Sequence, residues 1–201
     1  PPQNTVSLNE TVMTVIAPFK ISEHTPPNVV AILRGNDPIL RNEYIVYSSH
    51  FDHVGIGMPS TSGDSIYNGA DDDASGTSVL LEVARAFATM KIPPARSVIF
   101  LAVSGEEKGL LGSKFFSENP TVPIDNIIMN INLDMVGRNH PDTVVAVGRQ
   151  YTNLGFLTDQ ILQKHPELGL TAIEDPEPEE QAFFRSDHLN FVNKDIPAIF
   201  F

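Results

Sequence analysis

Cysteine and tryptophan are both absent from this chain of 201 residues, and basic residues are scarce. Without cysteine the chain forms neither disulfides nor thiolate metal sites, so His, Asp or Glu side chains would have to hold any metal ion. The chain has 13 Lys and Arg against 25 Asp and Glu, a formal net charge of -12. Such a charge repels polyphosphates and anionic lipid surfaces, so nucleic acid is not expected as a partner.

Long hydrophobic runs are also lacking. No apolar run reaches about 18 residues, so we expect no membrane insertion by this domain. Hydrophobic residues make up 41% of the chain, which suffices for the core of a single domain. The chain opens at Pro1 without a leader of the secretory kind and stops inside an apolar run. We therefore interpret residues 1–201 as one domain that is truncated at both ends.

The apolar pattern predicts an alternation of strands and helices. Runs of β-branched and apolar residues predict strands at 11–16, 28–33, 44–49, 97–104, 127–133, 143–147 and 196–201. Apolar residues at helical spacing predict helices around 79–87, 110–117 and 156–162. The acidic, proline-spaced residues 174–180 are interpreted as a solvated loop. The alternation predicts an α/β fold, a three-layer α/β/α domain with a mixed, largely parallel central sheet.

Polar residues that could hold a metal come where these strands end. His50 and Asp52 are two residues apart at the end of one strand, and therefore on the same side if the strand continues. A zinc-bound imidazole commonly donates its other N–H to a carboxylate, so Asp52 could fix the tautomer of His50. A polar turn at the strand end explains this pair equally well.

Three adjacent carboxylates, Asp71, Asp72 and Asp73, precede the first predicted helix. A helix N-terminus stabilises nearby anions, and a pair of divalent ions bridged by one carboxylate would stabilise them more. Simple N-capping explains one Asp but not three in a row. The triplet therefore favours a metal site.

Two further acidic positions follow strands. Glu106 and Glu107 are adjacent and point in different directions, so one could bind a metal while the other acts as a general base. The alternative is that both glutamates only interact with the dipole of a helix that begins there. Asp134 ends an apolar strand, where a buried carboxylate is costly unless paired or metal-bound, and a solvated Asp beyond the strand is the alternative. His188 follows later, although a lone His is usually structural.

Together these positions offer two His with Asp and Glu carboxylates. That donor set suits two Zn²⁺ ions that share one carboxylate and keep an open position for water, with manganese or cobalt as substitutes.

On these residues the chain resembles a known family, the co-catalytic di-zinc aminopeptidases, which are related to glutamate carboxypeptidase II and the glutaminyl cyclases. It looks most similar to secreted bacterial members. The likeness covers nearly the whole chain from Asn28 onward. Five motifs carry it in family order: His50-Phe51-Asp52, Gly-Ala-Asp-Asp-Asp-Ala-Ser-Gly at 69–76, Ser-Gly-Glu-Glu at 104–107, Leu133-Asp134-Met135 and Ser186-Asp187-His188.

The resemblance implies a ligand set for two zinc ions. His50 and Asp134 would hold one zinc, Glu107 and His188 the other, and Asp72 would bridge them. The choice of Asp72 follows the family motif, and the neighbouring aspartates of the triplet stay open as alternatives.

The resemblance also implies roles in catalysis for two residues, with Asp52 orienting the first imidazole and Glu106 acting as the general base. Metal binding lowers the pKa of water from about 15.7 toward roughly 7. Glu106 would take the proton of that water and return it to the leaving amine. A secreted, periplasmic or cell-surface location is likewise only implied.

Removal of N-terminal residues from a peptide or protein substrate is the favoured interpretation. A carboxypeptidase or dipeptidase with the same site is the nearest alternative, with Arg185 as the one candidate for gripping a substrate carboxylate. A glutaminyl-cyclase-like transferase is disfavoured because that branch uses a single zinc. A non-catalytic binding module on the same fold is the alternative from another class. The sequence gives no signal for the oligomeric state.

Overall fold

The structure, a computed structural model, describes residues 23–138 and 140–201. The strand predicted at 11–16 lies outside these residues. The elements follow in the order β1 (Val29–Leu33), β2 (Tyr44–His50), β3 (Gly55–Ile56), β4 (Ile66–Tyr67), α1 (Ala74–Ala88), β5 (Ser97–Val103), α2 (Leu111–Glu118), β6 (Ile127–Asn132), β7 (Thr143–Val145), α3 (Leu154–Lys164), β8 (Thr171–Ile173), α4 (His188–Val192) and β9 (Ala198–Phe200).

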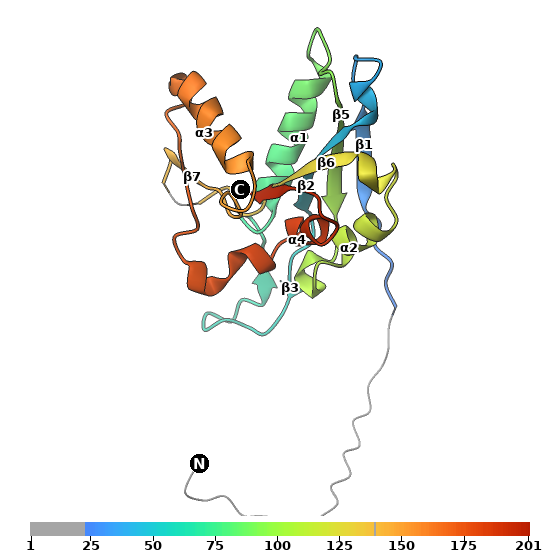
Figure 1. Cartoon of the computed structure of the whole chain (residues 1–201). Helices are drawn as coiled ribbons and strands as arrows, with labels where there is room; N and C mark the ends of the chain where they lie inside the picture. Colours follow the sequence, from blue (N-terminus) through green and yellow to red (C-terminus); the bar gives the residue numbers. More distant parts are fainter. Residues whose placement is uncertain (1–22, 139) are drawn as a thin grey trace, which may run out of the picture.

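The main sheet has five strands in the order β1-β5-β2-β6-β9 (Figure 1). The pairs β5–β2, β2–β6 and β6–β9 are parallel, and only β1 pairs with β5 in the antiparallel sense. Every residue of β5 except Ala102 is buried, as expected for a strand covered on both faces. The predicted mixed, largely parallel sheet is confirmed.

Helices cover both faces of this sheet. On one face Phe116 of α2 and Phe191 of α4 pack against Val46, Ile99 and Leu101. On the other face, α1 packs against strand residues of the opposite pleat through a cluster around Leu80, and α3 packs beside it through a cluster around Leu154. Because successive strand residues point to opposite faces, the apolar runs supply both cores. The predicted three-layer α/β/α architecture is confirmed.

The strand register places the ends of β2, β5 and β6 side by side. His50 is opposite Val103, and Ser48 is opposite Asn132. Chain segments that leave these three strands therefore emerge at one edge of the sheet. In open α/β sheets, this carboxyl edge is where ligands bind.

The structure also differs from the predicted elements in small ways. The strands expected at 143–147 and 196–201 are shorter, and the prediction missed the hairpin of β3 with β4, strand β8 and helix α4. These missed elements have only two to five residues each, too few to show a hydrophobic period. Within the described residues, no helix has the length and apolar character needed to cross a membrane.

Candidate metal centre

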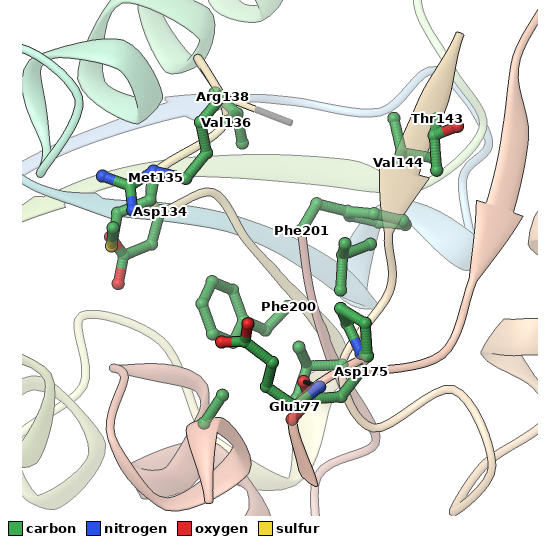
Figure 2. Close-up of a pocket in the computed structure, with 14 residues that line it drawn as sticks. Asp134, Met135, Val136, Arg138, Thr143, Val144, Asp175, Glu177, Phe200 and Phe201 are labelled. Atoms are coloured by element: carbon green, nitrogen blue, oxygen red, sulfur yellow. Dashed lines mark hydrogen bonds between the residues drawn. The ribbon is translucent and has the colours of Figure 1, made fainter. Parts of the chain in front are cut away.

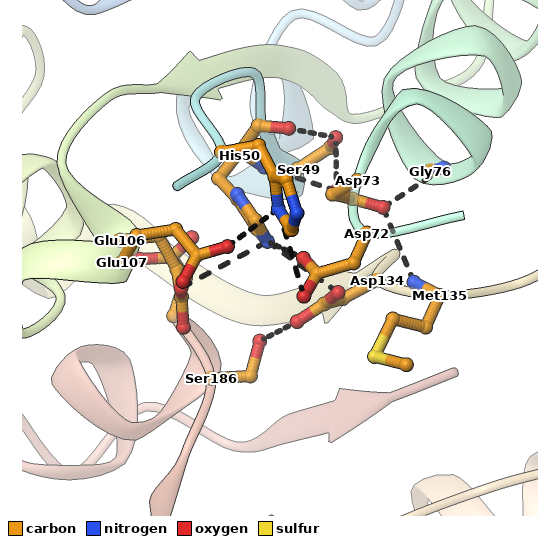
Figure 3. Close-up of polar contacts among 12 residues, drawn as sticks. Ser49, His50, Asp72, Asp73, Gly76, Glu106, Glu107, Asp134, Met135 and Ser186 are labelled. Carbon is orange, nitrogen blue, oxygen red and sulfur yellow. Dashed lines mark hydrogen bonds and ion pairs between the residues drawn. The ribbon is translucent and has the colours of Figure 1, made fainter. Parts of the chain in front are cut away.

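The functional side chains come from four segments at the carboxyl edge of the sheet. His50 is the last residue of β2, and Asp134 follows β6 by two residues. Glu106 and Glu107 follow β5 in a short 3-10 turn, which Gly105 opens in a left-handed conformation (φ 79°). Asp72 precedes α1. Most sequence-predicted site residues are thus close together (Figure 3).

A first group gathers around the imidazole of His50. Its Nε2 atom lies 3.1 Å from Asp72 Oδ1 and 3.4 Å from Asp134 Oδ1. Two ligands of a tetrahedral zinc ion at about 2.0–2.1 Å are about 3.3 Å apart, so these spacings suit a shared metal. Glu106 Oε2 lies 4.0 Å from the same nitrogen and faces the same space.

A second group shares Asp72 with the first. The Nδ1 atom of His53 lies 2.6 Å from Glu107 Oε1 and 3.9 Å from Asp72 Oδ2. Each carboxylate oxygen of Asp72 therefore faces a different group, the arrangement expected of a bridging ligand. His53 was not among the predicted site residues. Its position three residues after His50 was a signal that the sequence analysis did not use.

Several buried polar atoms of these two groups lack hydrogen-bond partners. They are His50 Nε2, His53 Nδ1, Glu107 Oε1 and Asp134 Oδ1. Buried polar groups in proteins are almost always hydrogen-bonded, so two such atoms facing each other within each group indicate a missing partner in each. Imidazole nitrogens and carboxylate oxygens form a donor set that suits zinc. The residues present therefore fit the metal that the sequence predicts.

Asp52 lies beside the imidazole that it is predicted to orient, and its main chain and its carboxylate have different nearest partners. The main-chain carbonyl oxygen of Asp52, rather than its carboxylate, lies nearest to His50 Nδ1, at 3.0 Å against 3.7 Å. The Asp52 carboxylate instead accepts hydrogen bonds from the backbone N–H groups of Glu106 (3.2 Å) and Glu107 (3.4 Å). Asp52 thus contacts both the imidazole and the segment that carries the two glutamates.

The structure does not bring His188 into either group. This residue begins α4 and is fully buried, with its ring centroid 5.0 Å from that of Phe183 and 5.2 Å from that of Phe200. Burial lowers the pKa of His188 to about 4. The ligand role that the resemblance implies for His188 stays a prediction.

The concentration of carboxylates shifts the pKa values of the site. Burial alone lowers the pKa of His50, but the hydrogen bond and charge of Asp134, with the charges of Asp73 and Glu106, raise it to about 10. Burial raises the pKa of Glu106 to about 8, and the neighbouring carboxylates Asp187, Asp134 and Glu107 add to this rise. The site thus strongly favours a positive charge at its centre.

A chain of buried hydrogen bonds leads to Asp134. Asn130 Nδ2 donates to Ser48 Oγ (2.9 Å), and Ser48 Oγ donates to Asn132 Oδ1 (2.6 Å). Asn132 Nδ2 then donates to Ser186 Oγ (2.7 Å), whose hydroxyl donates to Asp134 Oδ2 (2.7 Å). The last hydrogen bond holds one oxygen of Asp134 and leaves the other, Oδ1, facing His50.

Asp73 connects the segments that carry the other ligands. Its side chain is 1% exposed and accepts hydrogen bonds from Ser49 Oγ (2.8 Å) and from the backbone N–H groups of His50 (3.2 Å), Gly76 (2.9 Å) and Met135 (3.2 Å). The hydrogen bond to Gly76 caps helix α1. Asp73 therefore has a structural role, while Asp72 faces the two groups.

A cavity of about 370 Å³ adjoins the first group through Asp134, which is one of its lining residues (Figure 2). Asp134 and Met135 line its end at the site, and Val147 and Phe200 are among its apolar walls. Asp175 and Glu177 line it as well. The one basic residue of the lining, Arg138, forms an ion pair with Asp71. The cavity therefore offers apolar surface with carboxylates and without an uncompensated positive charge.

The fold and this site define a class of protein, the α/β domains with a carboxylate and histidine centre for zinc. The chain belongs to peptidase family M28, whose family model matches residues 28–201. The predicted metallopeptidase resemblance is thereby confirmed.

Individual relatives agree with the family assignment. Leupeptin-inactivating enzyme 1 of Streptomyces exfoliatus is 30% identical over 186 residues, which are 92% of this chain and 37% of that protein. A probable zinc metalloprotease of Pyricularia oryzae is 39% identical over 124 residues, 60% of this chain and 22% of that protein. The solved aminopeptidase from Aneurinibacillus sp. strain AM-1 matches with a TM-score of 0.62 and 27% identity, over 86% of this chain and 38% of that one. The chain thus spans less than half the length of each of these proteins.

Proposed function

We propose that this chain carries the catalytic centre of a zinc-dependent aminopeptidase that uses two zinc ions. The observation that carries the proposal is the pair of side-chain groups that share Asp72, one oxygen to each, with Glu106 beside the first. His50, Asp72 and Asp134 would hold the first ion. Asp72 and Glu107 would hold the second, together with an imidazole.

Zinc bound at this position supplies a Lewis acid that makes water nucleophilic near neutral pH. Glu106 would act as the general base that takes a proton from the attacking water and later returns it to the leaving amine. Its side chain is only 11% exposed and faces the first group, which supports this role. The backbone hydrogen bonds to Asp52 hold the segment that carries Glu106 in place.

The charges around the site support the choice of the N-terminal end of a substrate. Carboxylates line the cavity beside Asp134, and they attract an α-ammonium group and repel a C-terminal carboxylate. Arg185, the candidate for gripping a carboxylate, lies 3.3 Å from Glu180 in a surface ion pair, and Arg138 is paired with Asp71. A carboxypeptidase would require a free cation close to the cavity. The secreted location stays a prediction from the resemblance.

The test combines metal analysis with turnover. The purified chain should contain zinc and hydrolyse aminoacyl-p-nitroanilides with a free α-amine but not their N-acetylated forms. Glu106→Gln should retain zinc and lose roughly 10²–10⁴-fold in kcat, the usual contribution of general acid–base catalysis. Glu118→Gln, at an exposed position of α2, is the matched control and should keep full activity.

Each contrary result points to a different alternative. Hydrolysis of peptides only from the C-terminus would replace the aminopeptidase with a carboxypeptidase. Zinc binding without any turnover, even of dipeptides, would favour a non-catalytic binding module. Absence of zinc after reconstitution would refute the metal centre itself.

A further inference from the structure

We infer that the cavity beside Asp134 selects substrates whose N-terminal residue is Lys or Arg, and that Asp175 and Glu177 bind the cationic end of that side chain. This inference deepens the proposed aminopeptidase function and rests on it. An N-terminal Lys or Arg carries two positive charges, one on the α-ammonium group and one on the side chain. The α-ammonium group is next to the scissile bond and therefore belongs at the Asp134 end of the cavity. The second charge can reach the carboxylates that line the cavity farther on.

Both carboxylates belong to the acidic, proline-spaced residues 174–180, which the sequence predicts to be a solvated loop. Most of this segment is exposed, but Asp175 is half-buried, and both Asp175 and Glu177 line the cavity. In Figure 2 the Glu177 side chain extends beside the ring of Phe200, on the side toward Asp134. This part of the segment thus presents negative charge to the cavity and not only to the solvent.

The backbone of the segment holds the two acidic side chains at the cavity. Glu177 lies between two prolines, which fix their own φ angle and restrict the residue that precedes each of them. Its backbone N–H group also donates a hydrogen bond to Asp175 Oδ1 (2.9 Å). The segment follows strand β8, which pairs with β7, and the backbone N–H group of Ala146 donates to the carbonyl oxygen of Ile173 (2.9 Å). The site for the second charge is therefore formed before a substrate binds.

Neither carboxylate is neutralised within the part of the chain that the structure describes. No Lys, Arg or His side chain there forms an ion pair with Asp175 or Glu177. The basic residue of the lining, Arg138, pairs with Asp71 instead. Two carboxylates without a cation create a negative potential that attracts a positively charged group.

The walls of the cavity suit the apolar part of a basic side chain. Val144, Val147 and Phe200 are among its lining residues. Lys and Arg bury their methylene stems along apolar surface and keep the charged end in a polar place. A Leu side chain would use the apolar walls but leave both carboxylates unpaired, and a Glu side chain would bring a like charge to them. Apolar walls with acidic residues beyond them therefore fit Lys or Arg best.

Aromatic rings lie close to the same acidic residues. Asp175 and Val147 also line a neighbouring cavity of about 220 Å³, together with Tyr151 and Phe183. The rings of Tyr151 and Phe183 are in contact, with centroids 4.8 Å apart. Because the face of an aromatic ring attracts cations, these rings add to the attraction that Asp175 exerts on a cationic side chain.

The test compares p-nitroanilides of Lys, Arg and norleucine, because norleucine has the unbranched stem of Lys without its charge. At low ionic strength kcat/KM should be about 10-fold higher for Lys and Arg than for norleucine, since each partly exposed ion pair contributes a factor of about three. Salt should reduce this ratio. Asp175→Asn and Glu177→Gln should each lower the ratio about 3-fold. Glu179→Gln, an exposed position of the same segment outside the cavity lining, is the matched control and should keep it.

Binding is measured separately by calorimetry on the zinc-loaded chain with L-lysinol and L-norleucinol, which have no bond to hydrolyse. Lysinol should bind about 10-fold more tightly, and the Asp175→Asn/Glu177→Gln variant should remove the difference. Equal affinities for the two alcohols, or a Lys to norleucine ratio that the double variant leaves unchanged, would overturn the side-chain site. Continued hydrolysis of the norleucine substrate would then leave the aminopeptidase function intact. Failure of the zinc-loaded chain to hydrolyse any of the three p-nitroanilides would refute the proposed function, and the two alcohols would still decide the side-chain site.

Discussion

Ser186 should affect zinc binding without touching the metal. Its hydroxyl donates to Asp134 Oδ2 and accepts from Asn132 Nδ2, both at 2.7 Å, in a fully buried position. In Ser186→Ala, the Asp134 carboxylate loses a charge-assisted hydrogen bond, and the Asn132 amide keeps a buried donor without an acceptor. Residues that orient a metal ligand typically contribute 10–100-fold to metal affinity, so we expect the first zinc to bind 10–100-fold more weakly.

The same change should lower the stability of the chain. An unsatisfied buried donor costs about 1–3 kcal/mol, and a hydrogen bond to a charged group contributes about 1.5–3 kcal/mol. We therefore expect the free energy of unfolding, measured with urea in the presence of chelator, to fall by about 3 kcal/mol. Ser117→Ala is the matched control. Its buried hydroxyl donates only to the Lys114 carbonyl oxygen in its own helix, and its loss should cost less than about 1 kcal/mol.

A double-mutant cycle tests the physical reason. In the Ser186→Ala/Asn132→Ala variant the orphaned amide is gone, so the double variant should be destabilised by at least 1 kcal/mol less than the sum of the single variants. Additive stabilities together with wild-type zinc affinity in Ser186→Ala would refute the reasoning, because they would show that the buried hydrogen-bond chain does not act on Asp134.

Three further predictions concern charge. Asp72→Asn should weaken zinc binding at both sites, measured by equilibrium dialysis. Asp71→Asn, the same change at the preceding residue, should leave both sites filled. Peptides with N-terminal Lys or Arg should be cleaved with higher kcat/KM than peptides with N-terminal Asp or Glu, and Glu177→Gln should reduce this preference. The chelator-treated chain should lose stability from pH 6.5 to 8, measured by urea titration. In the folded chain the pKa values of Asp73 (about 7), Glu106 (about 8) and His50 (about 10) are all raised. Between pH 6.5 and 8 the folded chain therefore binds protons that the unfolded chain has already released, so raising the pH favours unfolding. A rise in stability over this pH range would contradict the raised pKa values.

Much of the fold could be predicted from local sequence patterns. The apolar runs of β2, β5 and β6 and the helical period of α1 are strong signals because they describe elements buried on one or two faces. Motifs at the ends of these strands could be placed at one edge because parallel strands end together. The register of β2 with both neighbours, which brings His50 and Asp134 together, follows from this arrangement.

The remaining features of the site depend on contacts between distant segments. Sequence could not divide the roles of the three aspartates, because capping by Asp73 and bridging by Asp72 depend on how the 69–73 loop folds over β2. The approach of His53 to Glu107 depends on the same loop through Gly69. The orientation of the His188 ring, which contacts Phe183 and Phe200, is likewise decided by tertiary packing.

Hydrogen bonds to the backbone and to buried polar side chains, and not a metal ion alone, hold the carboxylates of the site in position. Asp73 ties β2, α1 and the segment after β6 together, and Asp52 ties the glutamate turn to β2. Like charges brought this close raise the free energy of the folded chain, and a bound cation removes that cost. These hydrogen bonds, the framework of the site, therefore hold the carboxylates close together against their mutual repulsion, and zinc binding removes that repulsion. Substitutions that loosen the framework should weaken metal binding even where every proposed ligand is intact, whereas removal of a ligand carboxylate should weaken metal binding and stabilise the chelated chain.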